Sequence, residues 1–174
     1  MNIENAIKSA TKILLKNKIK FPKLDSEILM SEAINQDRKF VILNLDQKLK
    51  KKTLSFFKNL IKKRSMGNPI AYLIGKKEFW NSEFQIKNDV LIPRPDTEIL
   101  VEEALNFFTY KNKLKILDIG VGSGCVLLSI LKEKRNFSGV GIDISEKCLD
   151  LSRINSLKLG LKNLESSKSG EFQI

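Results

Sequence analysis

The chain has 174 residues, enough for one ordinary domain or two small ones. With 42% hydrophobic and 29% charged residues it has the composition of a soluble globular protein, and no apolar run approaches the roughly 18–20 residues of a membrane span. The N-terminus has no basic region followed by an apolar core, so we expect a cytoplasmic protein without a secretory signal. Cys125 and Cys148 match no metal or redox spacing, which predicts two small buried thiols and no metal site.

The net charge of +11 belongs almost entirely to the first half of the chain. Residues 1–75 carry 16 Lys and Arg against 6 Asp and Glu, whereas residues 76–174 carry 15 against 14. The positive electrostatic field of these residues favours an anionic binding partner, such as RNA or the ribosome. The alternative explanation is a lysine-rich genome that fills every solvated helix face with lysine, and the abundance of Lys, Ile and Asn favours it.

The first 75 residues have the pattern of a small helical bundle. Apolar residues at three- and four-residue spacing predict helices over about 2–17, from Asp25 or Ser26 to about 34, near 38–43, and from about 49 to 64. Gly67-Asn68-Pro69 ends the last of these, since proline cannot continue a helix. A bundle of this size is near the limit for a stable independent core.

From Ala71 the hydrophobic period changes. Residues 78–86 and 90–92 predict two strands that turn at Lys87-Asn88-Asp89, and this β-hairpin linker over 76–93 would join the two parts of the chain. Pro93-Arg94-Pro95 then predicts extended backbone. Asp96 or Thr97 would cap a helix that carries apolar residues from Ile99 to Phe108.

A strand, a glycine loop and a helix follow. Residues 114–119 predict a strand, Gly120, Gly122 and Gly124 alternate in the loop, and aliphatic residues at helical spacing resume at Cys125. Such a loop brings backbone and a helix N-terminus close to a ligand. A second strand over 139–143 ends in Asp143, Ser145 would cap a helix that Gly160 ends, and 161–164 would begin a third strand.

This alternation predicts an α/β fold with a parallel, doubly wound sheet and right-handed crossovers. Residues 165–174 are polar and without periodicity, and so few strands do not make a stable open sheet. We therefore expect the chain to stop within a domain.

The spacing of the glycines limits the classes of ligand that the loop could bind. A dinucleotide fingerprint would place its third glycine at position 125, which is Cys here, and no Lys-Ser/Thr pair follows as in a phosphate-binding P-loop. Asp143 is placed to accept hydrogen bonds from the two hydroxyls of a ribose across the strand ends. Asp118-x-Gly120-x-Gly122-x-Gly124 with an acid after the next strand resembles the S-adenosylmethionine site of class I methyltransferases. A glycine turn without a ligand is the alternative.

Three upstream segments make the resemblance more specific. Gly67–Gly75, Glu78-Phe79-Trp80 and Leu91–Glu98 resemble signatures of the methyltransferases that modify peptide chain release factors at the N5 of a glutamine. The similarity covers about residues 1–164. It implies a helical release-factor-binding-like domain over 1–75 and a partial Rossmann-like, class I S-adenosylmethionine-binding domain over 94–174.

The resemblance also implies site residues and a partner. The substrate would be the glutamine of the Gly-Gly-Gln motif of a class 1 release factor, and the helical bundle would help to engage that factor. Gly120, Val121, Gly122, Ser123 and Gly124 would line the methionine and ribose of the cofactor, and Asp143 would hold the ribose. The segment Pro93–Glu98 would lie near the cofactor.

One motif of this family is missing. The family carries Asn-Pro-Pro-Tyr after its fourth strand, where it orients the poorly nucleophilic amide nitrogen for attack on the methyl group, and the chain contains no such tetrapeptide. We therefore expect a truncated member with weak cofactor binding and negligible turnover, and no residue is predicted to be catalytic. Arg94 and Glu98 are expected to be structural or close to the cofactor.

Two other functions remain open. A fragment of a nucleic-acid N6-adenine methyltransferase would suit the basic first half, although the upstream signatures favour the glutamine enzymes. A non-catalytic module that binds a release factor or the ribosome is the second. A dehydrogenase is disfavoured by Cys125.

Overall fold

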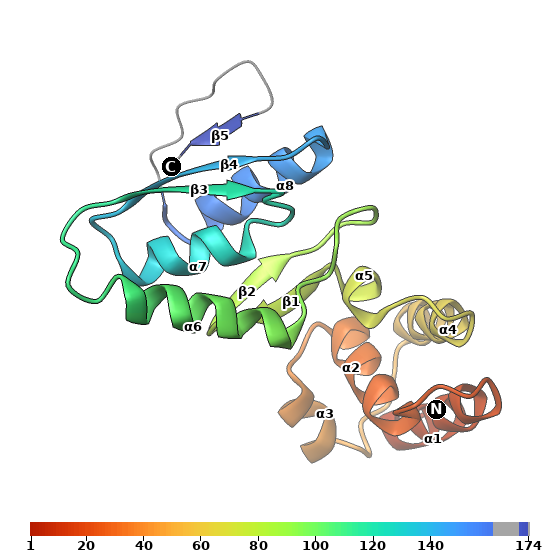
Figure 1. The fold of residues 1–174 in the computed structure, drawn as a ribbon. Helices are drawn as coiled ribbons and strands as arrows, with labels where there is room; N and C mark the ends of the chain where they lie inside the picture. Colours follow the sequence, from red (N-terminus) through yellow and green to blue (C-terminus); the bar gives the residue numbers. More distant parts are fainter. Residues whose placement is uncertain (162–170, 174) are drawn as a thin grey trace. The chain divides into compact units, whose positions relative to one another are not determined.

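The computed structural model of the protein describes residues 1–161 and 171–173. The chain divides into two compact units, Met1–Ile74 and Gly75–Ile174, called here the helical unit and the sheet unit. Their elements are labelled in Figure 1.

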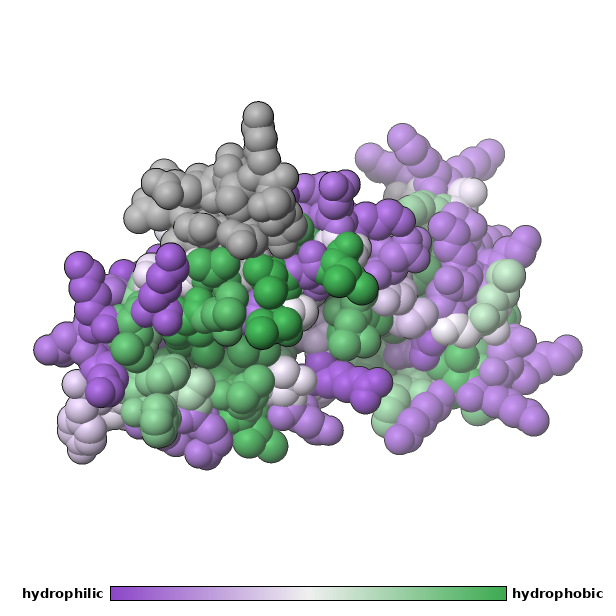
Figure 2. All heavy atoms as spheres, turned by 45° about the horizontal axis from the view of Figure 1, so that its top comes forward, coloured by the Kyte–Doolittle hydropathy of each residue, from purple (hydrophilic) through white to green (hydrophobic). Residues whose placement is uncertain are grey.

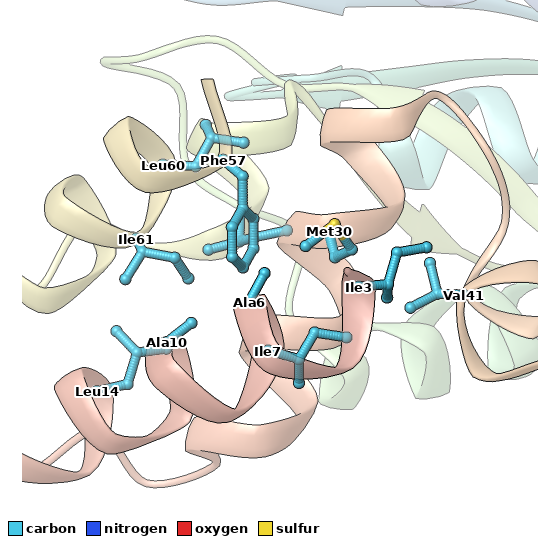
Figure 3. Close-up of a cluster of buried hydrophobic side chains, with 11 residues drawn as sticks. Ile3, Ala6, Ile7, Ala10, Leu14, Met30, Val41, Phe57, Leu60 and Ile61 are labelled. Carbon is cyan, nitrogen blue, oxygen red and sulfur yellow. The ribbon is translucent and has the colours of Figure 1, made fainter. Parts of the chain in front are cut away.

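The helical unit is built from amphipathic helices around one apolar core. Its helices are α1 (Ile3–Lys16), α2 (Pro22–Ile34), α3 (Arg38–Leu43), α4 (Lys51–Ser65) and α5 (Ile70–Ile74). The core side chains come from α1 to α4, as Figure 3 shows for Ile3, Ala6, Ile7, Ala10, Leu14, Met30, Val41, Phe57, Leu60 and Ile61. The predicted helices near 2–17, 38–43 and 49–64 are confirmed. The two longer ones bury an apolar stripe, and α3 buries Val41.

Two details of the helical unit differ from the sequence prediction. Helix α2 begins at Pro22, so Asp25 is not a cap but lies buried in the helix, where its carboxylate accepts a hydrogen bond from Arg64 Nε at 2.7 Å. Proline fits the first helical turn because its φ is already helical and its missing N–H has no partner there anyway. The second difference is α5, a short helix where we expected the period to change to that of strands.

The sheet unit combines a hairpin with alternating strands and helices. Its elements are β1 (Lys76–Phe79), β2 (Ser82–Gln85), a 3₁₀ turn η1 (Pro95–Thr97), α6 (Glu98–Phe107), β3 (Lys115–Ile119), α7 (Cys125–Glu133), β4 (Ser138–Ile142), α8 (Glu146–Lys158) and β5 (Glu171–Gln173). The structure therefore has the mixed helix and sheet content of an α/β fold, as predicted.

The hairpin turns at a different place from the predicted one. Strands β1 and β2 pair antiparallel with Phe79 opposite Ser82, so the turn consists of Trp80 and Asn81, both with positive φ. This is the geometry of a two-residue hairpin turn whose twist matches that of the strands. Residues 87–92 form no strand. Lys87-Asn88-Asp89 does form a turn, in which Val90 N donates to Lys87 O at 3.3 Å, but this turn does not join the two strands of the hairpin.

The hairpin is fastened to helices α7 and α8 of the sheet unit. Lys132 Nζ on α7 donates to Ser82 Oγ at 2.7 Å. Lys158 Nζ on α8 donates to Glu83 Oε1 at 2.7 Å, and this bond together with that from Lys76 lowers the pKa of Glu83. The hairpin is thus a structural part of this unit.

Strands β3 and β4 are parallel, as predicted, and β5 pairs antiparallel with β4. The short strand β5 was not predicted, and the predicted third strand over 161–164 lies, apart from residue 161, outside the described residues. Gly139 of β4 allows α7 to pack closely on the sheet, because a Cβ there would lie 2.7 Å from Cδ1 of Leu127.

Candidate functional site

The loop between β3 and α7 needs its three glycines for conformation. Gly120, Gly122 and Gly124 have φ values of +83°, +54° and +81°, which L side chains rarely adopt. A Cβ on Gly120 would meet nothing within 4 Å, whereas one on Gly124 would lie 2.8 Å from Cδ1 of Leu128. The loop therefore presents bare backbone beside Gly120 and packs tightly on α7 at Gly124.

Asp143 and the glycine loop converge at the carboxyl ends of the parallel strands. Ile119 and Ile142, the last residues of β3 and β4, are paired, and Asp143 follows at once. Its Oδ2 accepts a hydrogen bond from Gly122 N at 3.0 Å, and its Oδ1 accepts one from Ser145 N at 2.9 Å. The structure thus brings together Gly122 and Asp143, both of which the sequence predicts to be site residues.

Ser145 occupies the N-cap position of α8, as predicted, but its side chain makes no capping hydrogen bond. The carboxylate of Asp143 instead accepts a hydrogen bond from the backbone amide of Ser145, just before the helix begins. Asp143 therefore joins the start of α8 to the glycine loop.

The backbone amides of the loop are directed into the protein. Gly120 N and Val121 N both donate to Ile142 O, at 2.8 and 3.0 Å, and Gly124 N donates to Val121 O at 2.8 Å. Together with the bond from Gly122 to Asp143, these occupy amides that a phosphate-binding loop would offer to its ligand. The loop is consequently poorly suited to hold a pyrophosphate.

The side chains of the predicted loop residues Val121 and Ser123 lie inside the unit. Val121 is 5% and Ser123 is 2% exposed. These two residues line the loop through their backbone only. Of the five predicted loop residues, Gly120 and Gly122 are the ones that retain surface.

Asp118 adds a second carboxylate to this end of the sheet. Burial raises the pKa of Asp118 and the nearby charge of Asp143 raises it further, while a hydrogen bond from the Leu127 amide at the start of α7 acts in the opposite direction. Two carboxylates close together give this edge a negative field, which favours a ligand that carries positive charge.

Buried polar side chains of α8 donate hydrogen bonds to the backbone of the glycine loop. Ser152 Oγ donates to Gly122 O at 2.8 Å. Asn155 Nδ2 donates to Ser123 O at 2.9 Å and to Gln85 O at 3.1 Å, and its Oδ1 accepts from Gln85 N at 2.7 Å. Asn155 thus links the loop to strand β2.

The sequence analysis missed this support. On α8 the apolar Leu157 is 57% exposed, while Ser152, Asn155 and Ser156 are fully buried. The available signal was the spacing of these three polar residues, three and four apart, which places them on one helix face. Ser152 and Asn155 are buried because the loop and the hairpin offer backbone groups that need partners, and Ser156 Oγ donates to the carbonyl of Leu161.

The segment Pro93–Glu98 is held against the hairpin. Glu98 Oε1 accepts a hydrogen bond from Trp80 N at 3.0 Å, so Glu98 has a structural contact, while Arg94 is exposed and extended. Thr97 is the N-cap of α6 without a side-chain hydrogen bond. On α6 only Val101 is fully buried, and Ile99 and Leu100 of the predicted apolar face are exposed.

One face of the β3–β4 pair is apolar and open among the described residues. Leu117 and Ile119 are 58% and 75% exposed. In Figure 2 apolar side chains form a broad patch on the part of the surface that carries the sheet. Parallel strands are normally covered on both faces, so this face has the character of an interior surface.

Other chemistry finds little support in the described residues. They contain no cluster of three or more His, Cys, Asp or Glu that would hold a metal ion. Cys125 and Cys148 are free, and burial raises the pKa of both thiols, which keeps them protonated and unreactive. No helix in the described part of the chain is long and apolar enough to cross a bilayer.

Comparison with known proteins identifies relatives of both units. Residues 5–75 match the family described as the PrmC N-terminal domain. Over 164 residues the chain is 42% identical to the "Release factor glutamine methyltransferase" of Buchnera aphidicola subsp. Acyrthosiphon pisum, a match that covers 94% of this chain and 58% of the relative.

Two further relatives carry the same name. The protein from Buchnera aphidicola subsp. Schizaphis graminum is 41% identical over 172 residues, which cover 99% of this chain and 62% of the relative. That from Clostridium acetobutylicum is 34% identical over 172 residues, which cover 99% and 60%. The chain thus spans about three fifths of the length of the curated relatives that it matches.

Proposed function

We propose, for a chain that is a relative of the release factor glutamine methyltransferases along nearly its whole length, that its sheet unit binds S-adenosylmethionine. We further propose that the chain represents the cofactor-binding and partner-binding portion of an enzyme that methylates a glutamine of a class 1 release factor. The observation that carries the proposal is the hydrogen bond from Gly122 N to Asp143 Oδ2, which places loop and acid at one edge of the sheet.

The chemistry of this edge fits S-adenosylmethionine better than a dinucleotide. Each oxygen of Asp143 accepts one backbone hydrogen bond and keeps a lone pair for a ribose hydroxyl. The two carboxylates, Asp118 and Asp143, suit the positive sulfonium of this cofactor and would repel a pyrophosphate. The occupied amides of the loop likewise leave a pyrophosphate without donors.

S-adenosylmethionine would supply an electrophilic methyl group, and the residues described here would hold and orient it. Gly120 and Gly122 allow close approach, and Asp143 fixes the ribose. Orientation of the glutamine amide is assigned in the family to Asn-Pro-Pro-Tyr, which this sequence does not contain. We therefore assign binding and positioning roles, and no catalytic residue, to this chain.

Cofactor binding is tested by equilibrium dialysis with labelled S-adenosylmethionine and, in parallel, labelled NAD. We expect weak but saturable binding of S-adenosylmethionine, none of NAD, and a loss of about tenfold or more in Asp143→Asn. Asp150→Asn is the matched control, since Asp150 pairs with Arg153 on the surface of α8. Preferential binding of NAD, or equal affinity in the two variants, would contradict the proposal.

Methyl transfer is tested separately. The purified chain is incubated with labelled S-adenosylmethionine and a class 1 release factor, and we expect no transfer above background. Robust labelling of a glutamine would show that the 174 residues already contain a complete catalytic set.

A further inference from the structure

A groove lies between α1 and α4 of the helical unit, far in sequence from the glycine loop. It encloses about 350 Å³, and its lining is almost wholly apolar or small: Met1, Ala6, Ser9, Ala10, Ile13, Leu54, Phe57, Lys58, Ile61, Lys62 and Ser65. This is more than twice the ~150 Å³ of an apolar cavity that accepts a benzene molecule. The groove therefore has room for several apolar side chains of a ligand.

The groove exists because α1 presents small side chains to α4. Ala6 and Ala10 are 3% exposed and face the region of Phe57 and Ile61, as Figure 3 shows. At its edge, Ile13 is 47% exposed although it is a large aliphatic residue. Met1, which also lines the groove, is 57% exposed, so large apolar side chains lie open to solvent at its edge.

The charged side chains that line the groove are all basic. Lys58 and Lys62 are the charged residues of its lining, and neither forms an ion pair with any part of the chain that the structure describes. Helix α4 carries further lysines and Arg64 but no acidic residue. The field over the apolar lining therefore favours an acidic ligand.

The dimensions of the groove match a helix. Its lining on α4 runs from Leu54 to Ser65, a rise of roughly 16 Å, or three helical turns. A helix laid along it would insert apolar side chains at i, i+3 or i+4, and i+7. Nucleic acid is disfavoured because the lining offers two cations and an otherwise apolar wall to a phosphate backbone.

We propose that the α1–α4 groove binds an amphipathic helix of a protein partner, with apolar side chains in the groove and carboxylates against Lys58 and Lys62. The site needs neither the cofactor nor the glycine loop, so its test does not depend on whether the sheet unit binds S-adenosylmethionine.

The probe is a pair of fluorescein-labelled helical peptides of roughly 16 residues with the same leucine face, flanked by Glu in one and by Lys in the other. Fluorescence anisotropy with the full chain at low salt should show saturable binding of the Glu peptide, at least about tenfold tighter than that of the Lys peptide. Absence of binding by the Glu peptide, or its displacement by single-stranded RNA, overturns the proposal.

Variants locate the binding. Lys58→Glu/Lys62→Glu should reverse the preference between the peptides, whereas the matched control Lys52→Glu/Lys63→Glu changes net charge equally on exposed positions outside the groove lining and should leave it intact. Ser9→Trp, at an exposed position, should fill the groove and abolish binding of both peptides while circular dichroism shows a folded chain. An equal effect of the two double variants, or unchanged binding by Ser9→Trp, would contradict the location.

Discussion

Replacing Asn155 by alanine removes the side chain that ties the glycine loop to strand β2. In the wild-type chain this amide makes three hydrogen bonds, two with the backbone of Gln85 and one with Ser123 O. Asn155 has no exposed surface. The alanine variant therefore leaves the buried carbonyl of Ser123 and the two groups of Gln85 without their partner.

The expected decrease in the free energy of unfolding can be estimated from these unsatisfied groups. A buried polar group left unsatisfied costs about 1–3 kcal/mol, and water can replace part of what the half-buried Gln85 loses. We expect Asn155→Ala to lower the free energy of unfolding of the sheet unit by about 2–4 kcal/mol. Ser156→Ala is the matched control: it is equally buried on α8, but its Oγ makes one bond, to Leu161 O at 2.7 Å, and its loss should cost about 1 kcal/mol.

The chain provides its own probe for this measurement. Trp80, the single tryptophan, lies in the hairpin turn of the sheet unit, so its fluorescence during urea unfolding reports this unit separately from the helical one. Hydrogen exchange at the Gln85 amide should accelerate in Asn155→Ala and not in Ser156→Ala. Equal unfolding midpoints for the two variants would refute the argument.

Three further substitutions test the packing and the charges. Gly139→Ala should destabilise the sheet unit by about 1–3 kcal/mol in the same urea titration, because its methyl group would overlap with Leu127, and an unchanged midpoint would count against this. Phe57→Ala should destabilise the helical unit by about 3–5 kcal/mol, whereas Phe56→Ala, at the neighbouring exposed position, should destabilise it by less than about 0.5 kcal/mol. Unfolding followed by circular dichroism distinguishes the two variants. Because the pKa of Asp118 is raised above its ordinary 3.8, wild-type stability should fall as pH rises through that pKa. Asp118→Asn should lack this fall, and parallel stability curves for the two proteins between about pH 3 and pH 7 would contradict it.

The helices with a continuous apolar stripe are predictable from sequence. Helices α1, α3 and α4 begin and end within a residue or two of their predicted limits, and α7 begins at the predicted Cys125, because spacing and end signals are local properties. The position of the hairpin turn was harder to predict from the sequence. Its turn at Trp80-Asn81 is fixed by strand pairing and by Phe79 and Phe84, both buried with ring centroids 6.1 Å apart, whereas Lys87-Asn88-Asp89 has the stronger local turn signal.

The polar groups at the end of the sheet can be predicted from the sequence. Alternating glycines after one strand and an acid after the next require only local spacing, and the parallel pairing of β3 with β4 brings Gly122 to Asp143. The hydrogen bonds that hold the loop in place depend on the tertiary structure. The spacing of Ser152, Asn155 and Ser156 puts them on one face of α8, but the sequence does not say that this face is buried. That depends on β2 and the loop, whose backbone groups bond Asn155, because hydrogen bonding of a buried backbone is a property of the assembled chain.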